Sequence, residues 1–123
     1  MTYTNEAWRL AITKLLEMTS RNEIKWESSR LYEGDAWTSV DSSFQASQDN
    51  KAYVISKTRS RYYLDETEFV WQGGFNFSIF EDDGFKNFEH IATAPAINSL
   101  NALYDAAEGN SAFNRNALGG LLS

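Results

Sequence analysis

Residues 43–57 read Ser-Phe-Gln-Ala-Ser-Gln-Asp-Asn-Lys-Ala-Tyr-Val-Ile-Ser-Lys. Within this stretch, 43–47 and 52–57 are two short runs in which apolar side chains mix with small polar ones, as is typical of strands. Asp49 and Asn50, which lie between the runs, are residues that favour turns. The stretch therefore predicts an antiparallel hairpin in the middle of the chain.

A second hairpin is predicted on the C-terminal side of the first. Residues 75–79 alternate apolar and polar side chains, which indicates a strand. The Asp-Asp-Gly at 82–84 is typical of a hairpin turn, because Gly84 can adopt a positive φ without steric cost. Residues 85–91 then return as the partner strand.

Four further segments are less regular. Residues 69–71 are extended, but the glycine pair at 73–74 predicts a bulge or a close backbone approach that interrupts the strand. Residues 60–67 are polar and charged, which indicates a loop or an extension of the preceding strand. Residues 24–28 alternate and predict a short strand. Residues 30–41 form a loop whose tryptophan packs against the core.

Helices are predicted at both ends of the chain. Apolar side chains recur at helical spacing over 6–19, and Asn22 suits the left-handed residue that follows such a helix. Thr-Ala-Pro at 93–95 predicts the start of a second helix, because proline is favoured in the first helical turn. Gly109 should end that helix, and a last short helix should span 111–122.

Together these elements predict an α+β fold that forms a single domain over residues 1–123. We expect a single layer of four to five antiparallel strands, packed by an N-terminal helix and one or two C-terminal helices. The helices should cover the apolar face of the sheet, and the other face should display lysine, arginine, glutamine, asparagine and serine side chains.

Composition narrows the classes of function. The 123 residues have a net charge of −6, which argues against a general nucleic-acid binder and against docking on an anionic membrane. The absence of cysteine excludes disulfides and thiolate chemistry. Neither a signal peptide nor an apolar run long enough to cross a membrane is found in the sequence. We therefore expect a soluble protein with a cytoplasmic location.

The overall pattern resembles small bacterial and phage proteins of uncharacterised function. The resemblance rests on a helix that precedes Ile-Lys-Trp-Glu at 24–27, on a β-meander, and on Leu-Asn-Ala-Leu-Tyr-Asp-Ala-Ala at 100–107 before a short leucine-rich tail. It implies a cytosolic bacterial or phage setting. It transfers no functional residue to this chain.

The most unusual local feature is a set of cations at alternate positions, Lys57, Arg59 and Arg61. On a strand they would share one face, because successive side chains point to opposite sides. Cations so close together repel one another, so the pattern indicates a site for a phosphate or carboxylate, with Tyr63 or Trp71 stacking on a base.

Two qualifications accompany this candidate ligand-binding set. Tyr62 is a further aromatic residue that could stack on a bound base. In the alternative interpretation the cations form surface ion pairs with Glu66, Glu68 or residues of a neighbouring strand. Such pairs contribute about 0–1 kcal/mol each.

No catalytic set, metal site or cofactor is predicted. His90 is the only histidine, and its neighbour Glu89 would point to the opposite face of a strand. General acid–base catalysis requires an orienting group and a nucleophile within hydrogen-bond reach. The acidic residues at 81–83 lack the ligand spacing of a calcium loop, and we interpret them as a polar hairpin tip.

The aromatic residues exceed what one layer of core requires. Phe80 and Phe88 should lie on the sheet face opposite Phe77. Two covers for that second face stay open: a partner subunit, as in a homodimer, or the loop of residues 30–41.

These observations favour a non-enzymatic binding or regulatory protein that acts through a protein–protein interface. An inhibitor or an anti-defence protein of bacterial or phage origin is one form of this function. The alternative is a protein that binds or sequesters a small nucleotide-like anion at Lys57, Arg59 and Arg61. A hydrolase that uses His90 is the least favoured hypothesis.

Overall fold

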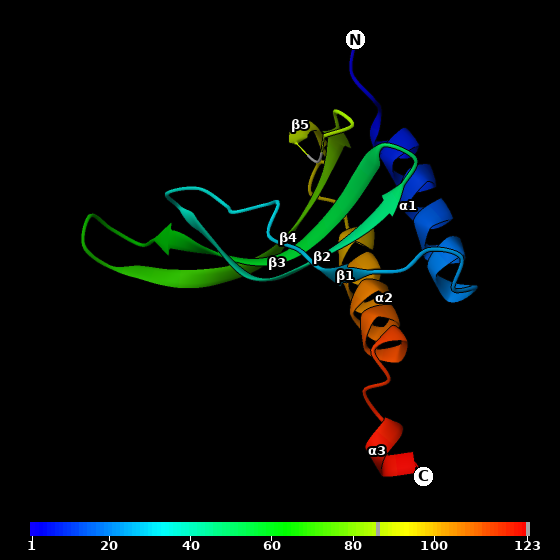
Figure 1. The fold of residues 1–123 in the computed structure, drawn as a ribbon. Coiled ribbons are helices and arrows are strands. Elements are labelled where there is room, and N and C mark those ends of the chain that lie inside the picture. Colours follow the sequence, from blue (N-terminus) through cyan, green and yellow to red (C-terminus); the bar gives the residue numbers. More distant parts are fainter. Residues whose placement is uncertain (86, 123) are drawn as a thin grey trace.

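The computed structural model describes residues 1–85 and 87–122, and it confirms the α+β fold (Figure 1). Within these residues five antiparallel strands form one open sheet in the order β1-β2-β3-β4-β5. The elements are α1 (Asn5–Ser20), β1 (Glu27–Ser28), β2 (Thr38–Gln48), β3 (Lys51–Tyr63), β4 (Phe69–Asp82), β5 (Phe88–Thr93), α2 (Ser99–Asn114) and α3 (Gly119–Leu122).

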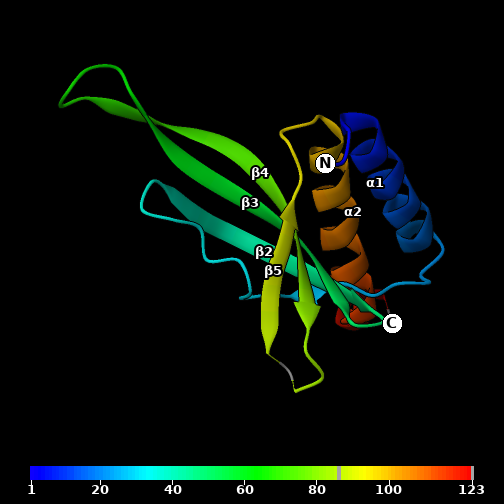
Figure 2. The same ribbon diagram turned by 90° about the horizontal axis from the view of Figure 1, so that it is seen from above.

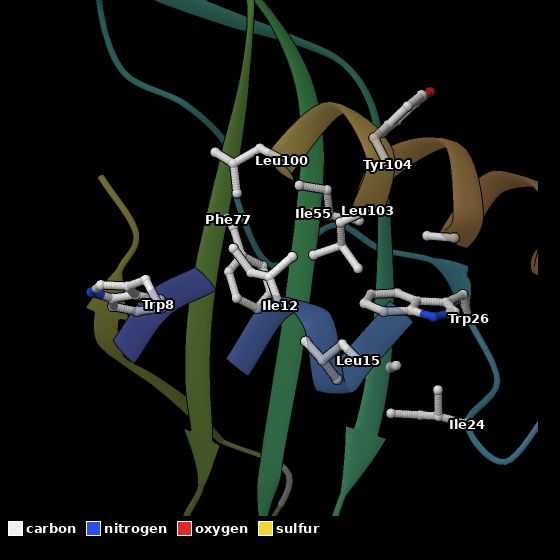
Figure 3. Packing of buried hydrophobic residues seen from close by; sticks show 12 residues of the cluster. Trp8, Ile12, Leu15, Ile24, Trp26, Ile55, Phe77, Leu100, Leu103 and Tyr104 are labelled. Atoms are coloured by element: carbon white, nitrogen blue, oxygen red, sulfur yellow. The ribbon is translucent and has the colours of Figure 1, made fainter. Parts of the chain in front are cut away.

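Helices α1 and α2 lie side by side on one face of the sheet, as the two ribbon views show (Figures 1 and 2). Their apolar side chains interlock with those of the central strands to form the main core (Figure 3). Ile12 and Leu103 from the helices and Ile55 and Phe77 from the sheet are almost completely buried. Fully burying a side chain of this size stabilises a fold by about 1.5–3 kcal/mol.

A buried polar network joins the two helices to the segment before β1. The backbone N–H of Trp26 donates to Oδ1 of Asn110 at 2.9 Å, and its indole N–H donates to the Thr19 hydroxyl at 2.9 Å. Asn110 also donates to Asn22 at 3.0 Å, and Asn22 has the predicted left-handed conformation with φ of 55°. Each of these buried groups therefore has a partner, as buried polar groups require.

The predicted hairpins are confirmed; the first is longer than expected, whereas the return strand of the second, β5, begins only at Phe88. Asp49 has φ of 57° in the tight turn between β2 and β3, and Gly84 has φ of 94° in the turn after β4. The polar segment after residue 60 extends β3 as far as Tyr63. The predicted loop at 30–41 is shorter than expected, since β2 begins at Thr38.

The predicted interruption of β4 at its glycine pair is wrong in one respect. Strands β3 and β4 pair continuously from Lys51 with Glu81 to Tyr63 with Phe69. Gly73 and Gly74 are therefore ordinary members of the ladder and form no bulge. The reason is that β3 also pairs with the residues before and after the glycines. Those hydrogen bonds offset the weak strand propensity of glycine.

The long β3–β4 hairpin extends away from the helices (Figures 1 and 2). We call residues 57–74 of this hairpin the arm. At its base the Phe75 ring still packs against Tyr104 of α2, with ring centroids 5.4 Å apart. Beyond this contact the sheet continues but the covering helices do not.

The C-terminal predictions need three corrections. Residues 93–95 do not open a helix, because the backbone N–H of Ala94 donates to the Phe77 carbonyl and prolongs the sheet edge. Helix α2 begins only at Ser99 and passes through Gly109 without a break. The predicted helix at 111–122 is divided, since its first turn belongs to α2 and α3 contains only Gly119–Leu122.

The predicted short strand before the first hairpin is also shorter than expected. Only Glu27 and Ser28 form β1, and they pair with Gln45 and Phe44 of β2. Trp26, at its start, is buried by the helices instead of lying in a strand ladder.

The second face of the sheet has a small apolar cluster of its own. Ala52, Val54 and Phe80 are buried there, with Leu31 and Tyr32 packed over them. Of the two predicted covers, the loop that follows β1 is the one that the structure shows. Burial raises the pKa of the Tyr32 hydroxyl, and the nearby carboxylate of Asp35 raises it further.

Candidate binding surface on the arm

The predicted site residues gather on one face of the arm. Lys57, Arg59, Arg61 and Tyr63 alternate along β3 and so share a face. Trp71 of β4 lies directly opposite Arg61 and therefore belongs to the same face. We call this the arm face.

The arm face is on the helix side of the sheet, which corrects the prediction that the cations lie on the uncovered side. The strand residues before them, Tyr53 and Ile55, point into the main core, and the period of two continues outward along β3. The cations are accessible because the helices end before the arm, leaving this part of the apolar side without a cover.

Guanidinium groups lie over aromatic rings along the arm face. The Arg59 Cζ atom is 5.2 Å from the centroid of the Trp71 ring. Arg61 lies between two rings, 5.1 Å from Phe69 and 5.5 Å from Trp71. Contacts of this kind contribute about 0.5–1 kcal/mol at exposed sites. They place the two guanidinium groups over rings that belong to β4.

The aromatic rings themselves form a continuous row. The Trp37 ring is 6.5 Å from Tyr63, Tyr63 is 5.6 Å from Phe69, and Phe69 is 5.6 Å from Trp71, measured between ring centroids. Two of these contacts are T-shaped, which brings the positive edge of one ring against the face of the next. The row is therefore ordered without the support of a core.

Arg59 also forms an ion pair across the sheet. Its Nε atom is 2.7 Å from Oδ1 of Asp41 on β2. Asp41 is the extra residue of a bulge, since Val40 pairs with Thr58 and Ser42 pairs with Lys57. A bulge redirects a side chain, and here it brings a carboxylate to the arm face. The predicted alternative of an ion pair with a neighbouring strand is thus confirmed for Arg59, through a residue other than Glu66 and Glu68.

The side chains of the arm face are substantially exposed for their size. Trp71 is 46% exposed, Tyr63 is 42% and Phe69 is 40%. Trp37, at the outer end of the row, is 64% exposed, so the prediction that it packs against the core is wrong. Monomeric proteins rarely leave contiguous aromatic area of this extent uncovered unless it binds something.

Tyr62 does not join this group. It follows Arg61 on β3, so its side chain is on the opposite face, across from Val70. It is exposed there, away from the aromatic row.

Three residues of the arm face were missed by the sequence analysis: Trp37, Asp41 and Phe69. Phe69 could have been found from the hairpin, because its parity along the strand equals that of Trp71. Asp41 depends on the position of a bulge, and Trp37 depends on the path of a loop. Neither has a signal in a single sequence.

His90 has a hydroxyl and an aromatic ring as its contacts. Its Nε2 atom is 2.6 Å from the Thr93 hydroxyl, and its ring packs edge-on against Phe80 at 5.4 Å. The side chain is exposed.

The carboxylates in the acidic turn after β4 accept backbone hydrogen bonds of the turn itself. Asp82 accepts the Gly84 N–H at 2.9 Å, and Asp83 accepts the Phe85 N–H at 2.8 Å. The hydrogen bond from the Phe85 N–H is the largest cause that lowers the pKa of Asp83. In the part of the chain that the structure describes, no group of three or more His, Asp or Glu side chains is arranged so that it could hold a metal ion.

A hollow of about 730 Å³ lies at the other end of the molecule, between the N-terminal segment and the end of β5. Tyr3 and Trp8 line one side of it, and Ile91 and Pro95 line the other. The arm cations are not among its lining residues, so the hollow is separate from the arm face.

None of the helices in residues 1–85 and 87–122 combines the length and apolar character needed to cross a membrane. Comparison with known proteins gives no match to a family model, to a curated protein or to a solved structure.

Proposed function

We propose that this chain is a non-enzymatic binding protein that acts through a protein–protein interface, and that the arm face is its contact surface. One observation supports the proposal above the others. Tryptophan, tyrosine, phenylalanine and arginine side chains gather in one ordered row on a part of the sheet that neither α1 nor α2 covers.

The composition of the row suits a protein interface. Residues that dominate binding energy at such interfaces are enriched in tryptophan, tyrosine and arginine. Aromatic side chains bring large contact area at little cost in conformational entropy, and the ring contacts restrict Trp71 and Arg61 before any partner arrives. The exposure of its aromatic side chains also suits a macromolecule better than a small ligand, which is usually enclosed by a concave site.

Binding of this kind would act by occupying the partner's surface. An inhibitor or an anti-defence protein of bacterial or phage origin would work in this way, and we include that role in the proposal. The chain as a whole is acidic, with a net charge of −6, which would keep such a protein soluble while the basic face selects the partner.

Site-specific photocrosslinking tests the proposal. A photoreactive phenylalanine analogue at Phe69 is on the arm face, and the same analogue at Val70 is on the opposite face one residue away. In cells that make the protein naturally, we expect discrete crosslinks to one protein species from position 69 and far fewer from position 70. The double variant Arg61→Ala, Trp71→Ala should lose them. Equal crosslinking from both faces, or none from either, contradicts the proposal.

A second candidate function is the binding of a small nucleotide-like anion. It is favoured by the three cations Lys57, Arg59 and Arg61 on one face, of which Arg59 has the carboxylate of Asp41 as a partner. Thermal-shift measurements with nucleotides test this candidate. Stabilisation that Arg59→Ala abolishes supports it, and an unchanged melting temperature removes it.

A further inference from the structure

The outer edge of β4 lacks a neighbouring strand along the arm. Strand β5 pairs with β4 only over Ser78–Asp82, and beyond it the Ala94 N–H donates to the Phe77 carbonyl at 2.8 Å. Among the described residues, none of the backbone hydrogen bonds between elements involves residues 69–75 on this side. Half of the peptide groups in this stretch therefore face outward without a strand to receive them.

The hydrogen bond to Phe77 identifies which peptide groups face outward. In an antiparallel strand the N–H and C=O of one residue point to the same side, and the side alternates along the chain. The Phe77 carbonyl points away from β3, and the register of β4 is continuous from there to Phe69. The groups that face outward hence belong to Phe69, Trp71, Gly73 and Phe75.

This edge lacks the devices that usually protect an edge strand. Residues 69–75 read Phe-Val-Trp-Gln-Gly-Gly-Phe, with no charge and no proline. Natural sheets discourage pairing at an edge with lysine, proline, bulges or short strands. An uncharged, regular edge of seven residues is instead suited to accept another strand.

Gly73 opens this edge further. A Cβ atom added there would meet nothing within 4 Å, so packing inside the chain does not require a glycine at this position. Glycine in a strand interior often marks a place where another backbone approaches closely. Gly73 pairs with Arg59 of β3, and the gap that it leaves in the row of side chains lies beside that guanidinium.

The charge next to the edge selects the kind of strand that fits. Three cations, Lys57, Arg59 and Arg61, lie on the arm face. Among the described residues they form one ion pair, that of Arg59 with Asp41. Arg59 and Arg61 extend from β3 over the Trp71 ring of β4, the strand that carries this edge. An incoming strand with carboxylates on this face would meet both guanidinium groups.

We propose that the β4 edge receives an extended acidic segment of a partner protein as an additional antiparallel strand. Backbone hydrogen bonds to Phe69, Trp71 and Gly73 would give the affinity, and carboxylates paired with Arg59 and Arg61 would give the specificity. This inference rests on the proposed function, because it names the partner chemistry of the same arm face. A second copy is less suited as the occupant, since pairing two β4 edges would place two basic stripes on one face.

The probe for this proposal is a synthetic peptide of sequence Thr-Glu-Val-Glu-Val-Glu-Thr, blocked at both ends, in which all glutamates share one face of a strand. The control peptide has lysine in place of each glutamate. Nuclear magnetic resonance of the full chain follows each amide. We expect the acidic peptide to shift the amides of Phe69, Trp71 and Gly73 and protect them from hydrogen exchange. The control peptide should leave them unchanged.

Gly73→Pro is the decisive variant. Its N–H faces outward, so proline removes one donor to the incoming strand without removing a hydrogen bond to β3. Binding of the acidic peptide should weaken about tenfold. Gly73→Ala keeps the N–H and should change binding about twofold or less, since the added methyl group meets open space. Amide spectra of both variants establish that the arm has kept its fold.

Four results would overturn the proposal: no shift at about millimolar acidic peptide, equal binding of the lysine peptide, unchanged binding by Gly73→Pro, or self-association of the chain through this edge. Sedimentation detects the last, as a dimer that Gly73→Pro removes and Arg59→Ala does not. The proposed function itself fails differently. If the proposed function is wrong, crosslinks from Phe69 are absent. If only the added strand is wrong, crosslinks from Phe69 form and persist in the Gly73→Pro variant.

Discussion

The body of the molecule and its arm use the same sheet in different ways. In the body, Ile55 and Phe77 are buried between the strands and two helices, and buried polar groups such as those of Trp26 and Asn110 have partners inside the chain. Along the arm, the same face carries the residues of the arm face, such as Arg59 and Trp71. Their side chains are about half exposed and contact mainly one another.

The difference shows that one strand pattern can serve both stability and recognition. The period of two continues from Ile55 to Arg61 on one face of β3, and what changes is the cover provided by the helices. Large side chains under the helices stabilise the fold through the removal of apolar area from water. The same class of side chain beyond the helices keeps that area available for a partner.

The largest effect should follow from Trp26→Ala in the body. Removing a buried tryptophan leaves a cavity and removes the indole N–H that donates to Thr19, so we expect the free energy of unfolding to fall by about 3–5 kcal/mol. Urea denaturation measures the change. Trp37→Ala on the arm is the matched control and should cost less than about 1 kcal/mol. Similar losses from both variants would contradict the division into body and arm.

Trp71→Ala should affect binding more than stability. Its ring contacts Arg59, Arg61 and Phe69, but it is almost half exposed, so the fold should lose about 1 kcal/mol or less. If the arm face binds a partner, the same change should weaken that complex by about 2 kcal/mol or more. Denaturation and a binding titration of the crosslinked partner measure the two quantities. A stability loss larger than the binding loss would assign Trp71 to the core.

Asn110→Leu sharpens the description of the body. The substitution removes the acceptor of the buried Trp26 N–H, so we expect a loss of about 1–3 kcal/mol in unfolding free energy. Asn101→Leu, at an exposed position of the same helix, is the control and should stay within about 0.5 kcal/mol. An equal effect at both positions would show that the buried network contributes nothing.

Glu89→Lys should slightly stabilise the body. Glu89 lies directly opposite Glu81 in the β4–β5 ladder, and like charges in that arrangement repel. A lysine there should raise the unfolding free energy by about 0.2–1 kcal/mol at low salt, and the gain should shrink at high salt. The test is denaturation at two ionic strengths. A gain that does not depend on salt would rule out the electrostatic cause.

The smallest expected effect is local and concerns the tip of the arm. Asp65 accepts the backbone N–H groups of Thr67 and Glu68, both at 2.8 Å, and these hydrogen bonds lower the pKa of its carboxyl below the ordinary value of 3.8. Since the folded pKa is the lower one, the contribution is complete above pH 3.8 and is lost as the pH falls through the folded pKa.

Amide hydrogen exchange and chemical shifts of Thr67 and Glu68 measure this loss. Asp65→Asn should show the weakened tip already at neutral pH, while the amides of the body stay unchanged in both proteins. A tip that stays ordered at low pH, or in the variant, would show that another interaction holds it.

The sequence predicted the parts of the fold that depend on local chemistry. Helix α1, the central hairpin and the positive φ of Gly84 follow from spacing and turn residues within a few positions. The C-terminal errors share one cause. Pro95 and Gly109 are local signals for a helix start and end, but Ala94 prolongs the sheet, and core residues on both sides of Gly109 keep α2 helical across it.

The sequence by itself determined that Lys57, Arg59, Arg61 and Tyr63 share a face, because the period of a strand is fixed by its backbone. Only the tertiary structure decided which face that is, that Trp71 and Phe69 lie beside the guanidinium groups, and that Asp41 reaches Arg59. These facts depend on strand register, on the position of a bulge and on where the helices end. Each is set by the packing of segments far apart in the chain, which no local pattern encodes.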